Sequence, residues 1–233
     1  MFWGMRRILN NLLRLPVRTC KSLWQWRSPA YRLQRQADRA VAAWIDPKRR
    51  NMLSAVPGFS SERELHLLAH LVRQAPPTGC IVEIGAYKGR STVWLVEAAQ
   101  KRSDRPRVIS IDPHLRDTWA TFCDVRTRFQ LAERGLEVVR GFSSAAGKTW
   151  SRPISLLWVD GSHEYPDVAL DIDLFVPHVV AGGWVVFDDA QGGKFPGVER
   201  AIAERMFGRS DFEHVGALKH FQLFRRQAAR AVA

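Results

Sequence analysis

The stretch from Ile81 to Ser91 constrains the fold of this chain more than any other. An apolar run ends at Gly85, a second glycine follows at Gly89, and a helical pattern begins at Ser91. This order is typical of a strand, a tight turn and a helix start, which in parallel sheets lie where nucleotide-like ligands bind. The stretch therefore predicts an open α/β sheet with a ligand site at the end of its first strand.

The rest of the chain after Cys80 alternates apolar runs with amphipathic segments. The predicted strands are 80–84, 107–111, 136–140, 154–159 and 183–187, and the predicted helices are 91–101, 116–133, 144–150, 164–179 and 197–207. Apolar strands between amphipathic helices predict a parallel sheet covered on both faces. Two short runs at 212–217 and 220–225 predict a closing hairpin with one antiparallel strand. We therefore expect a Rossmann-like, doubly wound, mostly parallel sheet of seven strands.

Positive charge is concentrated at the N-terminus. Residues 1–50 hold twelve Lys or Arg and two acids, whereas the remaining 183 residues hold 23 Lys or Arg and 21 acids. Because the body is nearly neutral, nucleic acid is not expected as a partner of the catalytic region. The three cysteines are scattered without CxxC spacing. We therefore expect no zinc site and no disulfide framework, and a reducing, cytoplasmic location.

Residues 1–50 are predicted to form a basic, tryptophan-rich helical arm, followed by a linker at 51–60 and a domain at 61–233. Apolar residues recur at helical spacing up to Pro16, and a second apolar stripe runs through 33–45. No apolar run reaches the ~20 residues of a membrane span. The domain is expected to begin with a helix, because Ser61 and Glu64 match a capping box.

Three interpretations of the arm remain open. Its helices pack on the catalytic body, as a cap or as a contact between copies in a homo-oligomer. Alternatively, residues 1–45 lie as an amphipathic anchor on an anionic membrane surface, where Trp, Leu and Arg suit the interface. In the third interpretation the segment is a targeting peptide, since it is rich in arginine and poor in acids.

Acidic side chains follow three of the predicted strands. Asp112, Asp160 and the pair Asp188–Asp189 stand where these strands end, so we expect them to converge on one crevice. Carboxylates packed together are costly unless they are neutralised. A divalent cation on Asp160, Asp188 and Asp189 is the simplest answer, and oxygen ligands favour Mg²⁺, Mn²⁺ or Ca²⁺. Alternatively, Asp188–Asp189 caps the next helix or forms a turn.

The glycine turn itself narrows the choice of ligand. Its pattern is Glu83-x-Gly85-x-x-x-Gly89, without the third glycine that a dinucleotide fingerprint needs, so NAD and FAD are disfavoured. Asp112, 23 residues after Gly89, is placed to bind ribose hydroxyls or to cap a helix. Glu83 interrupts an apolar run, so it needs a hydrogen-bonded partner from a ligand or from backbone amides.

These residues carry a resemblance to a known family. The stretch 82–91 resembles motif I of class I S-adenosylmethionine-dependent methyltransferases, and especially of the metal-dependent O-methyltransferases of the catechol type. The stretches 159–165 and 182–189 are similar to a related branch with macrolide-sugar O-methyltransferases and relatives of cephalosporin hydroxylase. The resemblance covers roughly residues 60–225, and the arm lies outside it.

The resemblance implies S-adenosyl-L-methionine as the cofactor. The turn would hold its methionine end, Asp112 its ribose, and Ser143 or Ser144 would lie near its adenine. The implied cofactor-binding residues come from the turn and from the ends of later strands: Glu83, Gly85, Ala86, Gly89, Ser91, Asp112, Ser143 and Asp160.

The resemblance also implies a metal, expected to be Mg²⁺, and a catalytic base. Asp160, Asp188 and Asp189 match the metal ligands, and His163 stands where the superfamily places its general base. The catechol enzymes have lysine at the position of His163 and asparagine as third ligand. This sequence fits the sugar-modifying branch better, which puts a catechol substrate in doubt. In the implied reaction the metal lowers the pKa of a substrate hydroxyl and His163 takes its proton.

The acceptor is expected to be a small molecule, a sugar or a lipid-linked glycan. The glycine-rich loop 190–197 is placed to line its pocket, with Lys194 reaching an anionic substrate. Two rival functions remain. One is a methyltransferase-like oxygenase that binds iron through the same carboxylates, although iron usually requires histidines. The other is a non-catalytic membrane- or RNA-binding protein with this fold.

Overall fold

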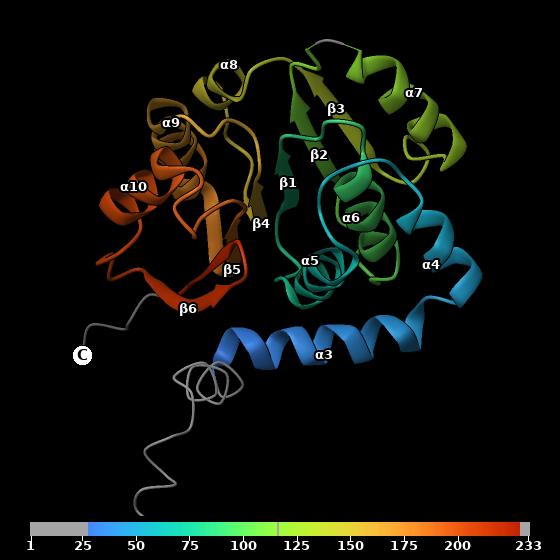
Figure 1. Cartoon of the computed structure of the whole chain (residues 1–233), viewed down its shortest axis with the longest axis horizontal. Helices are drawn as coiled ribbons and strands as arrows, with labels where there is room; N and C mark the ends of the chain where they lie inside the picture. The colour runs from blue at the N-terminus through green and yellow to red at the C-terminus, as the bar shows by residue number, and fades with distance from the viewer. Residues whose placement is uncertain (1–27, 116, 229–233) are drawn as a thin grey trace, which may run out of the picture.

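A seven-stranded sheet lies at the centre of the molecule, with helices packed on both of its faces (Figure 1). The computed structural model describes residues 28–115 and 117–228. The strand order is β3-β2-β1-β4-β5-β7-β6. This arrangement confirms the predicted Rossmann-like, doubly wound sheet.

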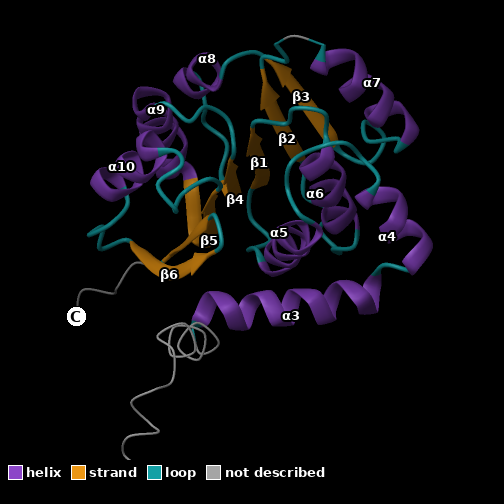
Figure 2. Ribbon diagram, viewed as in Figure 1, coloured by secondary structure: helices purple, strands orange, loops and turns teal. Residues whose placement is uncertain are grey.

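The elements follow the predicted alternation (Figure 2). The strands are β1 (Cys80–Ile84), β2 (Val108–Asp112), β3 (Leu136–Arg140), β4 (Ile154–Val159), β5 (Val179–Phe187), β6 (Phe212–Leu218) and β7 (Phe221–Arg226). The helices are α3 (Pro29–Trp44), α4 (Pro47–Ser54), α5 (Glu62–Gln74), α6 (Arg90–Gln100), α7 (Thr118–Arg128), α8 (Ser143–Lys148), α9 (Tyr165–Phe175) and α10 (Pro196–Arg205), with a 3-10 turn at Val176–His178. Strand β5 begins earlier than predicted because Val179 already pairs with Ile154 of β4.

The strand pairing sets the position of the site. Strand β1 pairs in parallel with β2 on one side and with β4 on the other. The chain order reverses between these neighbours, and open α/β sheets bind ligands at such a switch point. Strand β7 is antiparallel to both β5 and β6, which confirms the predicted hairpin with one antiparallel strand.

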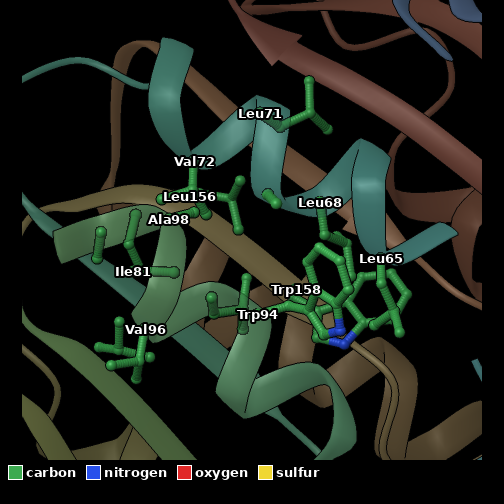
Figure 3. Close-up of a cluster of buried hydrophobic side chains, with 14 of the residues drawn as sticks. Leu65, Leu68, Leu71, Val72, Ile81, Trp94, Val96, Ala98, Leu156 and Trp158 are labelled. Atoms are coloured by element: carbon green, nitrogen blue, oxygen red, sulfur yellow. The ribbon is translucent and has the colours of Figure 1, made fainter. Parts of the chain in front are cut away.

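The core consists of two apolar layers, one on each face of the sheet. Ile81 and Trp158 point to the layer beneath α5 and α6, where they meet Leu68 and Trp94 (Figure 3). The alternate residues of the same strands, including Val82, point to the layer beneath α9 and α10. Strands buried on both faces explain why these segments, apart from Glu83, Ser110 and Ser155, are apolar on both faces rather than at every second position.

The described part of the predicted arm packs on the domain. Helix α3 contacts α5 and β6, and Ala30, Ala37 and Val41 of its apolar stripe are fully buried. The stripe predicted through 33–45 therefore faces protein. The predicted linker at 51–60 includes the end of α4, and the division into arm, linker and domain stays a prediction.

Two further expectations concern the ends of these helices and the membrane. The capping box at the start of α5 is confirmed, because the Ser61 N–H donates to Glu64 Oε2 at 2.7 Å. The helix predicted before Pro16 lies outside the described residues. Within residues 28–115 and 117–228, no helix is long and apolar enough to cross a membrane.

Candidate active site

A cavity of about 990 Å³ lies at the carboxyl ends of β1, β2, β4 and β5. This volume is near the upper end of the roughly 300–1,000 Å³ that is typical of small-molecule sites. Asp112, Asp160, Asp188 and Asp189 all line it, so the predicted convergence of these acids is confirmed.

Most of the predicted site residues border this one cavity. Those that line it are Gly85, Ala86, Ser91, Asp112, Ser143, Ser144, Asp160, His163, Asp188 and Asp189. Glu83 and Gly89 are not among the lining residues. Their assigned contacts with a cofactor, like the other residue roles that the resemblance implies, stay predictions.

Gly85 joins the turn to the neighbouring strand. Its φ is +92°, and a Cβ atom added there would lie 2.0 Å from the backbone oxygen of Asp160. The Gly85 N–H donates to the Ile111 carbonyl at 2.9 Å, and the Asp160 N–H donates to the Ile84 carbonyl at 2.8 Å. Glycine is therefore required by the close approach of β4, and the turn and Asp160 form one rigid unit.

Glu83 is fully buried beneath the turn. Its carboxylate accepts hydrogen bonds from Ser91 Oγ and Thr92 Oγ1, both at 2.6 Å, and from Ser110 Oγ at 2.8 Å. Its partners are therefore hydroxyl groups of α6 and β2, rather than the ligand or backbone amides that were expected. Burial raises the pKa of Glu83 to about 7, although the three hydroxyl groups pull it down. Glu83 thus anchors the first turn of α6.

Asp112 holds the other side of the turn. Its Oδ2 accepts the Tyr87 N–H at 2.7 Å, and its Oδ1 accepts the His114 N–H at 2.5 Å. Tyr87 has a φ of +50°, an uncommon conformation for a side-chain-bearing residue, and this hydrogen bond helps to hold it. The carboxylate therefore fixes the turn whether or not it also binds a ribose.

The loop before α5 supplies cavity residues that the sequence analysis did not identify. The Arg90 guanidinium donates to the carbonyls of Ser60 at 2.8 Å, Ser54 at 2.6 Å and Val56 at 2.5 Å. This clamp places Phe59 beside Tyr87, with ring centroids 5.3 Å apart, although Phe59 is 91% exposed. Only the tertiary structure brings this loop to the turn, so no local pattern marks it.

The acids across the cavity lie in a different environment. Burial raises the pKa of Asp188 to about 6, with further increases from the Asp189 and Glu64 carboxylates. Burial likewise raises the pKa of Asp160 well above its usual range, and the nearby carboxylates of Asp188 and Asp189 add to the effect. This side of the cavity therefore carries negative charge that the protein only partly compensates.

The predicted metal site is not formed by these acids as they lie. In residues 28–115 and 117–228, no group of three or more His, Cys, Asp and Glu side chains is arranged to hold a metal ion. Asp189 Oδ2 instead lies 2.9 Å from His163 Nε2, and Asp188 Oδ1 accepts the Asp189 N–H at 2.7 Å. One oxygen of each of these two carboxylates is therefore engaged by a protein group, and the assignment of Asp160, Asp188 and Asp189 as metal ligands stays a prediction.

His163 is oriented by its contacts on two sides. Its Nε2 faces the Asp189 carboxylate, and its ring stacks on Phe195 with centroids 3.9 Å apart. If Nε2 donates to the carboxylate, Nδ1 is left as the proton acceptor. Lys194, expected near an anionic substrate, also lines the cavity, with Nζ 4.5 Å from the Phe195 ring centroid.

His220 is a further cavity residue that the sequence analysis does not identify. It lines the cavity from the tip of the β6–β7 hairpin, and its carbonyl accepts the Ala190 N–H at 2.7 Å. Its charge opposes the increase in the pKa of Asp188. The residue was missed because the hairpin reaches the cavity only through its pairing with β5.

Comparisons with known proteins found a matching family model and a curated relative. Residues 82–190 match a family model described as a methyltransferase domain. An uncharacterized protein of Acanthamoeba polyphaga mimivirus is 24% identical over 173 residues, which are 66% of this chain and 76% of that protein.

Solved structures share the fold. The O-methyltransferase TomG from Streptomyces achromogenes, involved in tomaymycin synthesis and solved with S-adenosylmethionine, superposes with a TM-score of 0.58 at 21% identity, covering 84% of this chain and 90% of TomG. CalS11, a TDP-rhamnose 3'-O-methyltransferase of calicheamicin biosynthesis, gives a TM-score of 0.56 at 14% identity, covering 84% of this chain and 92% of CalS11.

Proposed function

We propose that the protein is an S-adenosylmethionine-dependent methyltransferase that methylates a hydroxyl group of a small molecule or a sugar. The match of residues 82–190 to a methyltransferase-domain model supports the reaction class. The observation that carries this proposal is the shared cavity. The cavity is lined by the glycine turn and Asp112, where the methyl donor is predicted to bind (the donor side), and also by His163 and Asp189. TomG and CalS11, which have the same fold, are O-methyltransferases, and the acceptor named for CalS11 is a sugar nucleotide.

In the proposed reaction His163 is the general base. Its Nδ1 takes the proton of the acceptor hydroxyl, and the oxygen attacks the methyl carbon as the carbon–sulfur bond breaks. The products are the methyl ether and S-adenosylhomocysteine, and the proton leaves His163 for water. The Asp189 carboxylate stabilises the imidazolium and fixes the ring. Holding donor and acceptor together supplies much of the rate, on the order of 7–11 kcal/mol at best.

A more specific version of the proposal adds a magnesium ion that assists the methyl transfer. It requires Asp189 to leave His163 and to join Asp160 and Asp188 around one cation. Hard oxygen ligands of this kind suit Mg²⁺. Methyl transfer measured with EDTA and then with added Mg²⁺ tests this form. A rate that does not respond would remove the metal and leave the rest of the proposal in place.

The central test is the substitution His163→Ala, with His178→Ala as a matched control outside the cavity. We expect calorimetry to show unchanged binding of S-adenosylmethionine. Release of S-adenosylhomocysteine in the presence of sugar-nucleotide acceptors such as TDP-rhamnose should fall by about 10²–10⁴-fold, because a general base is lost. An unaffected rate would remove His163 as the base. Failure of the wild-type chain to bind S-adenosylmethionine would overturn the proposal itself.

A further inference from the structure

Helix α3 has two faces of opposite character. Its inner face is apolar and buried against α5 and β6, as described above. Its outer face is exposed and consists of arginine, glutamine and alanine: Arg32, Arg35, Gln36, Arg39, Ala42 and Ala43. Arg32, Arg35 and Arg39 follow one another at helical spacing, so they form a single stripe, which we name the arginine face.

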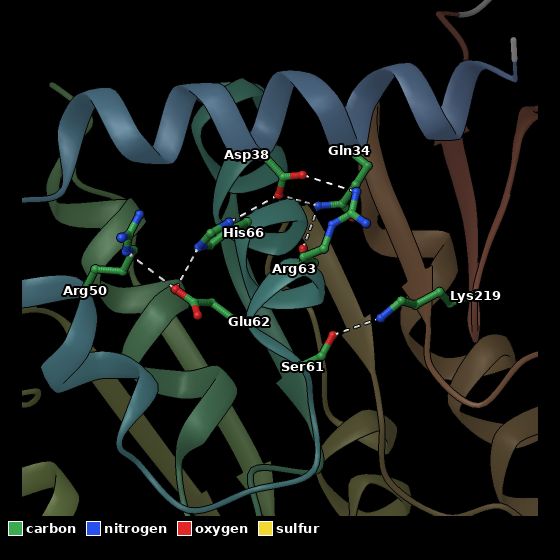
Figure 4. Close-up of polar contacts among 8 residues, drawn as sticks. All are labelled: Gln34, Asp38, Arg50, Ser61, Glu62, Arg63, His66 and Lys219. Carbon is green, nitrogen blue, oxygen red and sulfur yellow. Dashed lines mark hydrogen bonds and ion pairs between the residues drawn. The ribbon is translucent and has the colours of Figure 1, made fainter. Parts of the chain in front are cut away.

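The arginine face is not neutralised within residues 28–115 and 117–228. None of its three guanidinium groups has an ion pair or a hydrogen bond there. The only acid of the helix, Asp38, points inward, where its carboxylate lies 3.2 Å from both His66 and Arg63 (Figure 4). Like charges three and four residues apart on a helix are mildly destabilising, so this stripe is retained at a small cost in stability.

The next helix shows that the protein can pair such residues. In α4, Arg49 lies 2.7 Å from Glu97, and Arg50 lies 3.5 Å from Glu62. What distinguishes the arginine face is that three exposed arginines without such an acid lie in one stripe of a single helix. Its charge is available to a partner that approaches from solvent.

The sequence before α3 indicates the chemistry of that partner. Residues 1–27 hold six Lys or Arg and no acid, together with three tryptophans and many aliphatic residues. Basic residues mixed with tryptophan and leucine suit the boundary between lipid headgroups and acyl chains. A nucleic-acid partner fits less well, because residues 51–233 hold 23 Lys or Arg against 21 acids and are therefore nearly neutral.

We propose that the arginine face of α3 docks on an anionic lipid surface and holds the methyltransferase domain there. The buried inner face keeps α3 attached to α5, so the helix binds without leaving the domain. This inference does not rest on the reaction proposed above. Near an anionic membrane each basic residue contributes about fivefold to the partition coefficient, so three contribute on the order of 100-fold.

The test uses the full chain and its variant R32Q/R35Q/R39Q. The matched control, R105Q/R126Q/K148Q, removes the same charge from exposed residues elsewhere on the domain. Binding is measured by co-sedimentation with vesicles of phosphatidylcholine mixed with phosphatidylserine, and with pure phosphatidylcholine, at low and high salt. Thermal unfolding and S-adenosylmethionine binding confirm that each variant is folded.

We expect the wild type and the control to bind the anionic vesicles and to be released by salt. The arginine-face variant should bind them on the order of 100-fold more weakly. Equal binding by the two variants would overturn the proposal and assign any membrane contact to residues 1–27. Binding to a single-stranded RNA that is tighter than binding to anionic vesicles would also overturn it, in favour of nucleic acid.

Discussion

The two sides of the cavity are built in opposite ways. Around the glycine turn, Glu83 accepts three hydrogen bonds from hydroxyl groups and Asp112 accepts two from backbone N–H groups. At the ends of β4 and β5, Asp160 and Asp188 lie near other carboxylates, and the pKa of each is raised. The predicted donor side is thus held by hydrogen bonds within the protein, whereas at Asp160 and Asp188 burial, and then neighbouring carboxylates, disfavour the charged form. Such strain is typical of sites where chemistry or a bound cation relieves it.

The substitution with the largest expected effect is Gly85→Ala, which tests the donor side of the cavity. The new Cβ would lie 2.0 Å from the backbone oxygen of Asp160, at a φ of +92°. Both strands must move, so we expect a loss of more than about 3 kcal/mol in the free energy of unfolding and no binding of S-adenosylmethionine. Urea unfolding and calorimetry measure the two effects.

Gly192→Ala provides the matched control. Gly192 has a φ of +99°, but a Cβ added there meets nothing within 4 Å. The free energy of unfolding of Gly192→Ala should therefore decrease only by the cost of placing alanine in this backbone conformation, about 1 kcal/mol. Equal losses at Gly85 and Gly192 would show that the close approach of β4 is unimportant.

The second prediction uses the pKa of Glu83, which burial raises from 4.5 to about 7. In the folded state Glu83 keeps its proton at pH values where the unfolded chain has lost it. The contribution of Glu83 to stability is therefore fully present below about pH 4.5 and is lost as the pH rises to about 7, by on the order of 3 kcal/mol. Glu83→Gln cannot titrate, so its unfolding free energy should fall less over the same interval. If the free energies of unfolding of the wild type and Glu83→Gln changed in parallel with pH, the ionisation of Glu83 would not be the cause of the loss.

The sequence predicts the convergence of acids but not the bonds that hold them. Asp112, Asp160 and Asp188 each end a parallel strand, and such ends meet at one edge whatever the register. The pairing of Glu83 with Ser110 depends on the register of β1 with β2, which no local pattern specifies. The cavity positions of Phe59 and His220 depend on a loop and a hairpin brought in by tertiary packing. The metal prediction rests on the converging acids and on the resemblance and stays a prediction, and no local pattern predicts the contact of Asp189 with His163.

The last prediction, with the smallest expected effect, concerns the replacement of aspartate by asparagine at Asp112 and at Asp188. Asp112→Asn leaves a single oxygen for two N–H donors, so its amide nitrogen must face the N–H of Tyr87 or His114. An unpaired donor costs about 1–3 kcal/mol, so the free energy of unfolding at neutral pH should decrease. Asp188→Asn keeps the acceptor for the Asp189 N–H and removes a charge whose pKa is raised to about 6.

Asp188→Asn should therefore increase the free energy of unfolding, whereas Asp112→Asn should decrease it. The folded protein loses stability as the pH rises from 3.8 to about 6, because the buried carboxyl ionises less readily than in the unfolded chain. Asparagine avoids this loss, so Asp188→Asn should be more stable than the wild type above that interval, by at most about 3 kcal/mol. Urea unfolding of both variants without ligand, at neutral pH and near pH 4, measures the difference. If both substitutions changed the free energy of unfolding in the same direction at neutral pH, the proposed difference between Asp112 and Asp188 would be wrong.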